Sequence, residues 1–287
     1  MNILDDLKLQ YKTGGIVQQL IFWNVGIAIP LMILYAFSTN GFLTVMPWLE
    51  LNSNLSVFIT RPWTLLTYQF LHVEILHLLF NMIVLNFAGR LFLTFFTQKQ
   101  FLGVYILGGF FAGILYLISY FVLNHEAQLI GASGAIMAVM IAVAVYAPLY
   151  EIRLLLIGRV KLWHVALVFV ILDLIQIKSS NMGGHIAHLG GAFFGFSYIK
   201  FLQNGTDLSN ILTNFLNFFS DLFKPKKSMP FKKVHKNKNK PSETTFNSKG
   251  KDKTQQQIDE ILDKISKSGY ESLSKEEKDF LFKAGKN

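Results

Sequence analysis

Cysteine is absent from the 287 residues. The chain therefore has no disulfide framework, no thiol nucleophile and no thiolate ligand for a metal ion. Charged residues are also scarce, at 16%, against about 25% in soluble domains. Hydrophobic residues reach 52% and are gathered into long runs. Because runs of about 18 or more apolar residues are typical of membrane spans, the composition predicts a polytopic membrane protein.

The apolar runs predict an all-α fold, a bundle of six transmembrane helices. The first run is too long for a signal peptide, and no small-residue cleavage site precedes a soluble domain. The expected spans are 17–37, 66–96, 101–123, 129–147, 162–177 and 185–203, the second embedded mainly over its second half. The expected parts are an N-terminal segment (1–16), the six-helix domain (17–203), an interfacial helix with a basic run and linker (204–256), and a helical hairpin (257–287).

Lysine and arginine near the ends of the expected spans indicate an orientation. Positive charge near span ends is retained in the cytoplasm. We therefore predict that both termini are cytoplasmic, that the loops 124–128 and 178–184 lie outside, and that the membrane is the inner membrane of a bacterium. The opposite side has only Arg61 and Lys178, whereas the cytoplasmic side has Lys8, Lys12, Arg90, Lys99, Arg153, Arg159, Lys161 and Lys200.

Basic residues are concentrated after the last expected span. Residues 224–287 hold 17 of the 27 lysines and arginines, eight of them within 224–240. A basic run beside a membrane is attracted to anionic lipid by about 1 kcal/mol per residue. Just before it, residues 211–223 place apolar side chains on one broad face, as an interfacial helix does. We expect anionic lipid as the partner of this run, and no nucleic acid.

The end of the chain predicts a small helical hairpin. Apolar residues at Ile258, Ile261, Leu262 and Ile265 follow the spacing of one helix face, and Gly269 can close that helix. The sequence "SKEE" at 274–277 fits a capping box at the start of a second helix. Such a hairpin is too short to bury a core alone. It is expected to dock on its own membrane domain, on a second copy or on a partner.

Few side chains inside the expected spans are able to do chemistry. Burying such groups is costly unless they are matched, which makes each a functional candidate. Ser133 lies about five residues past its loop, roughly 8 Å deep at 1.5 Å per residue, and His188 lies at a similar depth. Three segments thus bring polar groups to one layer, which predicts a shared site. The set is His72, Glu74, His77, Asn81, Ser133, Asp173, His185 and His188.

The spacing of these residues indicates how they meet. His77 and Asn81 are four residues apart and share a helix face. Gly191 and Gly195 form a G-x-x-x-G pattern that lets helix backbones approach closely. The sixth span can therefore press against the fourth and bring His188 to Ser133, whose hydroxyl an imidazole base would activate. If Ser133 begins its helix, free backbone N–H groups there can face a developing oxyanion.

At these residues the chain resembles the rhomboid family of intramembrane serine proteases. The family motifs H-x-x-x-N, G-x-S-G and A-H-x-x-G-x-x-x-G occur in that order, on the second, fourth and sixth helices. Their matches here lie in "HVEILHLLFNMIVLNFAGR" (72–90), "GASGA" (131–135) and "AHLGGAFFG" (187–195). The resemblance covers roughly residues 15–203. Each motif alone is weak, but three in order and at one depth are highly specific.

The resemblance implies a role for each matched residue. Ser133 would be the nucleophile and His188 its general base, in a dyad without a carboxylate. His77, Asn81 and the Ser133 backbone N–H would form the oxyanion hole. His72 would bond loop backbone near the site, where Gly131, Gly191 and Gly195 would be structural. The substrates would be transmembrane segments of membrane proteins, cleaved near the outer face of the bilayer without cofactor or metal ion.

Other polar residues have plainer interpretations. We expect His185 to be interfacial and Asp173 to be protonated or hydrogen-bonded inside the bundle. Ser133 as packing filler, and His77 with Asn81 as an interhelical pair, remain alternatives. The chain departs from common family patterns at Thr64, where many members have arginine, and at Met137, where an aromatic ring often stacks on the base.

Rival functions lack parts of their signatures. A zinc intramembrane protease needs H-E-x-x-H, which is absent. An aspartyl protease needs two membrane aspartates on different spans, and Asp173 is the only aspartate within the expected spans. A transporter would more often show repeated halves, which we do not find. The nearest alternative is a rhomboid-like protein that binds membrane clients without cutting them.

Overall fold

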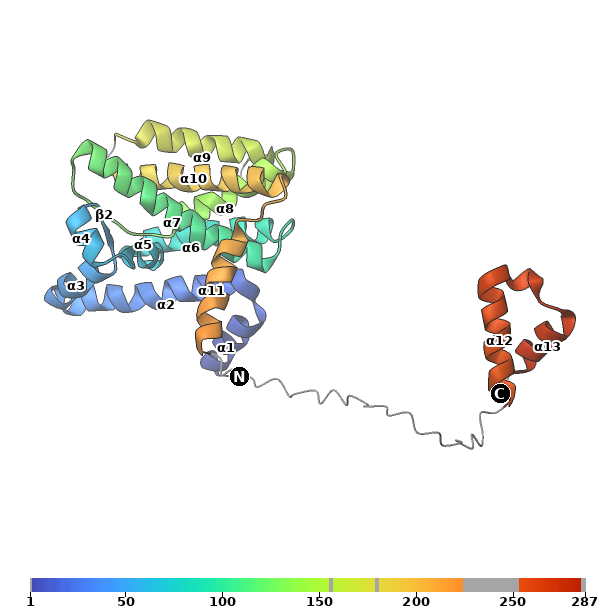
Figure 1. Cartoon of the computed structure of the whole chain (residues 1–287). Helices are drawn as coiled ribbons and strands as arrows, with labels where there is room; N and C mark the ends of the chain where they lie inside the picture. Colours follow the sequence, from blue (N-terminus) through green and yellow to red (C-terminus); the bar gives the residue numbers. More distant parts are fainter. Residues whose placement is uncertain (1, 155–156, 179–180, 224–252, 285–287) are drawn as a thin grey trace. The chain divides into compact units, whose positions relative to one another are not determined.

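The computed structural model describes residues 2–154, 157–178, 181–223 and 253–284 (Figure 1). The chain divides into two compact units, Met1–Pro225 and Lys226–Asn287. The first is a helical bundle and the second is a small helical hairpin, and each is described by itself. The predicted basic run at 224–240 lies outside the described residues, as does most of the predicted linker.

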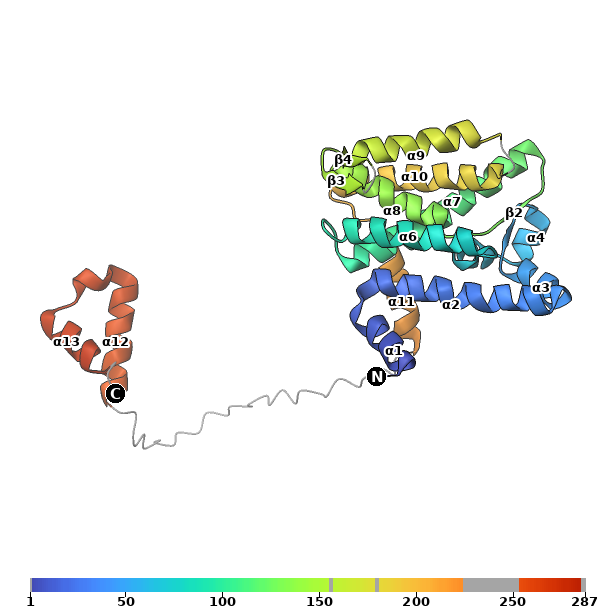
Figure 2. The ribbon, with the colours of Figure 1, turned by 180° about the vertical axis from the view of Figure 1, so that it is seen from behind.

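Long helices make up the first unit and run side by side in it (Figures 1 and 2). Three of the described helices are long and apolar enough to cross a membrane, α2, α6 and α7, while α8 and α9 are apolar but shorter. The prediction of six spans is therefore met only in part. The helices of the bundle are α2 (Gly15–Phe37), α6 (Ile75–Phe92), α7 (Gln98–Leu123), α8 (Ser133–Tyr146), α9 (Leu162–Gln176) and α10 (Met182–Gln203).

Helix α8 lies in the middle of the bundle, and its small residues Gly134 and Ala138 let α7 and α10 approach closely. All its residues from Gly134 to Ala144 are buried. Helix α10 packs directly against it: a Cβ added to Gly191 would collide with the carbonyl oxygen of Gly134, and one added to Gly195 with that of Ala138. The predicted close approach of these two segments is thus confirmed, and it depends on the glycines having no side chain.

Two expected spans begin later than the apolar pattern predicts. Residues 128 and 129 are not helical but form strand β2 (Gln128–Leu129), which pairs antiparallel with β1 (Leu51–Asn52). Helix α8 consequently starts at Ser133. Likewise, the chain before α6 forms α5 (Thr64–Thr67), the 3-10 turn η2 (Tyr68–Phe70) and an irregular stretch. His72 and Glu74 therefore precede the helix on which the sequence placed them.

The segment between α2 and α6 is held by aromatic and cationic contacts. The Arg61 guanidinium lies 4.3 Å from the ring centroid of Trp48, and it donates to the Pro47 carbonyl at 2.7 Å. Trp63 stacks on Trp48. Arg61 thus organises this segment although Thr64 occupies the usual arginine position. The segment comprises α3 (Thr39–Val45), the 3-10 turn η1 (Met46–Trp48), β1, α4 (Leu55–Thr60), α5 and η2.

The remaining elements of the first unit flank the bundle. A β-hairpin of β3 (Glu151–Leu154) and β4 (Gly158–Lys161) connects α8 to α9. Helix α1 (Ile3–Thr13) precedes α2, and α11 (Ser209–Phe223) follows α10. Exposed apolar side chains on α11 include Ile211, Phe215 and Phe219, in line with the expected amphipathic helix.

The second unit contains α12 (Lys253–Ser268), the 3-10 turn η3 (Tyr270–Ser272) and α13 (Lys275–Ala284). Gly269 follows α12 with φ at 77°, a conformation that favours glycine. The Ser274 backbone N–H donates to Glu277 at 2.7 Å, and the Glu277 N–H donates back to the Ser274 hydroxyl at 3.3 Å. The predicted capping box is confirmed, although α12 begins four residues before the predicted hairpin.

Candidate active site

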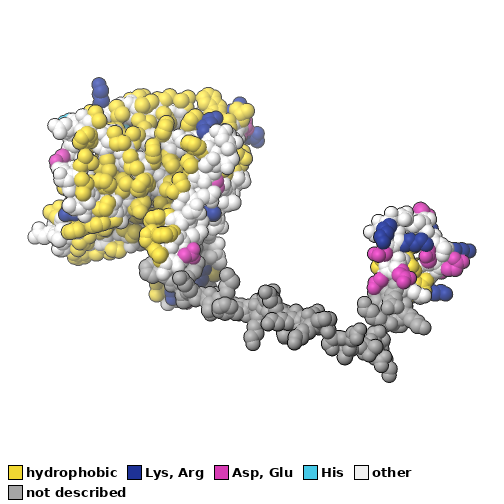
Figure 3. All heavy atoms as spheres, viewed as in Figure 1, with side chains coloured by type: hydrophobic (Ala, Val, Ile, Leu, Met, Phe, Trp, Pro, Cys, Tyr) yellow, Lys and Arg dark blue, Asp and Glu magenta, His cyan; other side chains and the backbone are white. Residues whose placement is uncertain are grey.

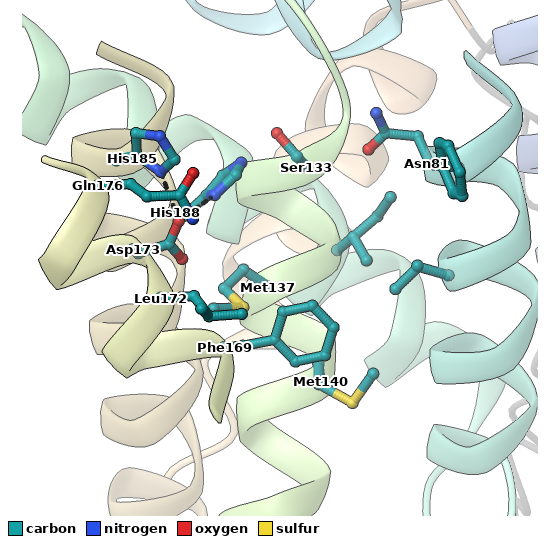
Figure 4. Close-up of a pocket in the computed structure, with 13 residues that line it drawn as sticks. Asn81, Ser133, Met137, Met140, Phe169, Leu172, Asp173, Gln176, His185 and His188 are labelled. Carbon is teal, nitrogen blue, oxygen red and sulfur yellow. Dashed lines mark hydrogen bonds and ion pairs between the residues drawn. The ribbon is translucent and has the colours of Figure 1, made fainter. Parts of the chain in front are cut away.

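A cavity of about 310 Å³ lies between α6, α8, α9 and α10 and holds most of the predicted site residues (Figure 4). Its wall is largely apolar, with a few polar groups at one end. Ser133 lies between His188 of α10 and Asn81 of α6. The lining residues are Phe80, Asn81, Val84, Ser133, Ile136, Met137, Met140, Phe169, Leu172, Asp173, Gln176, His185 and His188.

Ser133 is the first residue of α8, so its backbone N–H belongs to the turn whose amides have no acceptor within the helix. Those amides carry partial positive charge and favour an anion in front of them. The turn leading to Ser133 requires glycine at position 131, where φ is 117°. A Cβ there would lie 2.9 Å from His77 Cε1 and 3.9 Å from Ser133 Oγ. Gly131 thus lets the His77 ring approach the serine loop.

His188 is hydrogen-bonded to Asp173, a partner that the sequence analysis does not predict. His188 Nδ1 lies 2.8 Å from Asp173 Oδ1, and the aspartate side chain is only 8% exposed. A proton on Nδ1 that is donated to this carboxylate leaves Nε2 as the acceptor. That tautomer is the one a general base requires. The interaction joins α10 to α9 across the cavity.

His185 contacts the same carboxylate oxygen. Its Nδ1 is 2.8 Å from Asp173 Oδ1, and its side chain is 12% exposed. The expectation that His185 is interfacial is therefore wrong: as the residue three before His188, it lies on the same face of α10 and turns inward. Asp173 is hydrogen-bonded inside the bundle, as expected, but its partners are the predicted base and its neighbour. The sequence feature that could have predicted these contacts is the i, i+3 spacing of the two histidines, together with a single aspartate in the preceding span.

The hydroxyl of Ser133 and the ring of His188 face the same cavity without touching. Among the described residues, no hydrogen bond joins these two side chains. Met137, the substitute for the usual aromatic ring, is buried in the cavity wall one turn below Ser133. Catalytic hydrogen bonds are often long in proteins without substrate and tighten when it binds. The two side chains therefore share a cavity in which a bound segment could come between them.

Asn81 lines the α6 side of the cavity, whereas His77, one turn earlier on α6, is not among the lining residues and lies beside Gly131. Asn81 is buried, and its Nδ2 donates to the His77 carbonyl at 2.9 Å, which leaves the second amide N–H for another acceptor. The His77 ring stands edge-on to His72 at a centroid distance of 4.9 Å. His72 is fully buried, and neither ring nitrogen has a hydrogen-bond partner within the described residues. The Phe70 backbone nevertheless lies near enough to interact with the His72 ring, so the expected bond to loop backbone stays a prediction, and the ring contact of His72 is with His77.

One group of side chains in the described residues could hold a metal ion. Asp173, His185 and His188 each offer one ligand atom, and these atoms lie within 4.8 Å of one another. Both histidines present Nδ1 to one carboxylate oxygen. The group includes the predicted base, so a metal ion there and a free base exclude each other.

Comparison with known proteins identifies similar sequences. Residues 60–204 match the rhomboid domain family, and residues 243–285 match a family of unknown function, DUF6576. The chain is 28% identical over 145 residues to presenilin-associated rhomboid-like protein A, mitochondrial, of Danio rerio. It is 29% identical over 151 residues to presenilin-associated rhomboid-like protein, mitochondrial, of Homo sapiens. The alignments cover 50% and 51% of this chain, and 38% and 39% of those proteins.

These relatives correct one expectation. Both are named as mitochondrial proteins, and both come from animals. The expected location in a bacterial inner membrane is therefore wrong. The orientation was derived from the placement of lysine and arginine, but its assignment of the basic side to a bacterial cytoplasm falls with that membrane. The membrane nature of the protein is unaffected, since it follows from the apolar helices.

Proposed function

The chain belongs to the rhomboid family, and from that premise we propose that it is an intramembrane serine endopeptidase. Its substrates are transmembrane segments of other membrane proteins, cut near the face of the bilayer at which α8 begins. The observation that carries the proposal is the shared cavity, which Ser133, His188 and Asn81 line from three different helices. An arbitrary serine that fills space between helices has no reason to face a histidine and an amide.

The chemistry follows from the atoms that face the cavity. Ser133 Oγ attacks the scissile carbonyl carbon and loses its proton to His188 Nε2. The carbonyl oxygen becomes an oxyanion, which accepts hydrogen bonds from the Ser133 backbone N–H, Asn81 Nδ2 and the His77 ring. His188 then gives the proton to the departing amine, which breaks the peptide bond and leaves an acyl-enzyme. Water repeats the sequence on the ester and regenerates Ser133.

Asp173 adds a carboxylate to the predicted dyad. Its bond to His188 Nδ1 holds the ring in the tautomer that accepts at Nε2, and its charge stabilises the imidazolium that forms. We therefore assign Asp173 as the residue that positions the base. The contact of Asp173 with His188 supports this assignment. A carboxylate that only held the bundle together would not need the proposed base as its partner.

The cavity wall suits a membrane-spanning substrate. Phe80 and Val84 on α6 and Phe169 and Leu172 on α9 present apolar surface next to the polar end. We propose that a substrate segment enters between α6 and α9, the helices on either side of the opening. The ends of that segment remain in lipid while its backbone reaches Ser133. Lipid contact through the basic tail, and docking of the hairpin on a partner, are further proposals.

We further propose six membrane helices, including those too short to span alone. Helix α8 has 14 residues and is therefore about 21 Å long, against about 30 Å of hydrocarbon. A short helix is tolerated where protein surrounds it, as it surrounds α8. A short central helix also leaves Ser133 below the membrane surface, in a cavity that water can enter.

A second candidate function is the binding of membrane clients without cleavage. Two observations favour it: the relatives are named rhomboid-like rather than proteases, and Ser133 and His188 are not hydrogen-bonded to each other within the described residues. Under this function, the same cavity would hold a client segment, and Ser133 would have no reactivity.

One experiment separates the two functions. The purified full-length chain is given a generic membrane-anchored substrate, and in parallel a fluorophosphonate that labels activated serines. Cleavage and labelling in the wild type, both lost in Ser133→Ala, support the protease. A folded wild-type protein that binds the substrate but neither cleaves it nor reacts with the probe would establish the client-binding function instead.

A further inference from the structure

The contact between α9 and α10 has the composition of a metal site. Two imidazole nitrogens, Nδ1 of His185 and Nδ1 of His188, both lie 2.8 Å from one oxygen of Asp173. The two histidines are three residues apart on one helix, and the carboxylate comes from the facing helix. Pairs of ligands at i, i+3 that project inward from facing helices are a recurrent way of building metal sites in bundles.

The donor set favours zinc or a similar divalent transition metal. Imidazole nitrogen and carboxylate oxygen bind Zn²⁺ at about 2.0–2.2 Å, which puts neighbouring ligands of a tetrahedral site about 3.3 Å apart. The three atoms here lie within 4.8 Å of one another, and two of the separations are 2.8 Å. To reach coordination geometry, the two nitrogen–oxygen separations lengthen by about 0.5 Å, and the two nitrogens, which lie within 4.8 Å of each other, approach by up to about 1.5 Å. Gln176, which lines the same cavity, or a water molecule is available as a fourth ligand.

Metal binding at this point competes with the hydrogen bonds that position the base. His188 Nδ1 cannot donate a proton to Asp173 and an electron pair to a metal ion at once. In a neutral ring that binds the metal ion through Nδ1, the proton moves from Nδ1 to Nε2. Nε2 of His188 then carries a hydrogen and has no free lone pair with which to accept the proton of Ser133. Occupation of the cluster thus removes both the orientation and the basicity that His188 would use toward Ser133.

We propose that Asp173, His185 and His188 form a binding site for a divalent transition metal such as Zn²⁺, and that its occupation inhibits the enzyme. The binding site depends only on the geometry, whereas the inhibitory effect depends on the proposed protease function. The proposal concerns regulation and leaves the predicted catalysis free of metal.

Binding is tested on the full-length chain in detergent after treatment with a chelator. Zn²⁺ affinity is measured by competition with a fluorescent chelator, and Co²⁺ is added separately because its visible absorption reports the ligands. One equivalent is expected to bind to the wild type. His185→Ala and the more conservative His185→Gln are each expected to bind at least about tenfold more weakly, since loss even of an outer partner costs 10–100-fold. His164→Ala, which removes an exposed histidine from α9, is the matched control and keeps wild-type affinity.

Cleavage measured in the same samples separates the two proposals. Each variant is compared with its own metal-free rate, and Zn²⁺ is expected to inhibit the wild type over the concentration range in which it binds. Equal Zn²⁺ affinity of wild type and folded His185→Gln would overturn the site, whatever the cleavage rates. Binding without inhibition in an active wild type overturns the regulatory effect. If the metal-free protein is folded, binds Zn²⁺ through these residues and never cleaves, the site stands and the protease function fails.

Discussion

Two carboxylate contacts of almost the same length lie in very different surroundings. Asp173 Oδ1 is 2.8 Å from His188 Nδ1 in the bundle, and Glu277 Oε1 is 2.9 Å from Lys264 Nζ in the hairpin. The Asp173 side chain is 8% exposed, whereas those of Glu277 and Lys264 are 29% and 45% exposed. Figure 3 shows the same contrast in the surfaces: apolar side chains cover the visible face of the bundle, and charged side chains cover the hairpin.

Surroundings decide what each pair does. Water screens an exposed pair, and such pairs contribute between about 0 and 1 kcal/mol. A buried pair costs more to form, and breaking it by removing one partner costs about 3–5 kcal/mol because the other partner is left unmatched. A buried pair also fixes geometry, which matters only where chemistry uses the geometry. The bundle should therefore be sensitive to single polar substitutions and the hairpin should tolerate them.

The largest effect is expected at the nucleophile. Ser133→Ala and His188→Ala should each reduce cleavage by about 10⁴-fold or more, and the double variant should be no worse than either single variant, because the residues act as a unit. Rates are measured on one membrane-anchored substrate in detergent, with thermal unfolding as the control for folding. Substantial cleavage by Ser133→Ala would contradict the serine-protease proposal. The buried contact of Asp173 with His188 would then have no catalytic role to compare with the exposed pair.

The next effect tests the buried pair itself. Asp173→Asn should lower the cleavage rate by about 10²- to 10⁴-fold, since the amide can donate to His188 Nδ1 and thereby select the wrong tautomer. The loss should appear in kcat rather than KM, because Asp173 acts through the base. Asp173→Glu, which keeps the charge, should restore part of the rate. An Asp173→Asn protein that is as active as the wild type would reduce Asp173 to the structural role first expected of it.

Asn81 should show a smaller loss. Asn81→Ala removes one donor to the oxyanion, and the loss of one such donor typically costs about 10²–10³-fold in kcat. Since the His77 ring and the Ser133 N–H remain, we expect a loss toward the lower end of that range and little change in KM. His77→Ala should behave similarly or worse, because that ring also packs against Gly131 and His72. Wild-type rates for both variants would place the oxyanion elsewhere.

Local patterns in the sequence predict much of this molecule, and the exceptions share a cause. Ser133, His188 and Asn81 meet at one cavity because each lies at a predictable depth and face of its helix. The capping box of α13 is likewise local. The contact of Asp173 with His188 and the pairing of β1 with β2 join separate segments, and no periodicity reports which segments meet. The late start of α8 follows from that pairing.

The lengths of the short apolar helices could not be predicted, for a related reason. An apolar run shows that residues avoid water, but it does not distinguish lipid from the interior of a protein. Leu129 is apolar because it is buried beside Leu51 in the strand pair, and so the run at 129–147 extends past the helix. His185 shows the converse, since it looks interfacial by its position near a span end and yet is drawn inward by a carboxylate on the facing helix.

The smallest effect is expected at the exposed pair. Hydrogen bonding by Lys264 holds the pKa of Glu277 below its ordinary value of 4.5. Because the folded pKa is the lower one, the stabilisation is present above about pH 4.5 and is lost as the pH falls through the folded pKa.

Glu277→Gln removes the charge and keeps an oxygen for the Ser274 N–H, so cleavage in detergent should change by less than about twofold. Hydrogen exchange of the peptide covering α13 at pH 7 should be slightly faster than in the wild type, and the difference should shrink at an acidic pH below the folded pKa, where the wild-type carboxylate becomes neutral as well. Glu277→Ala, which loses the capping oxygen as well, should exchange faster than Glu277→Gln at both pH values. If Glu277→Gln instead lowers cleavage tenfold, the hairpin must act on the catalytic unit, and the two pairs would no longer differ in the way their exposure predicts.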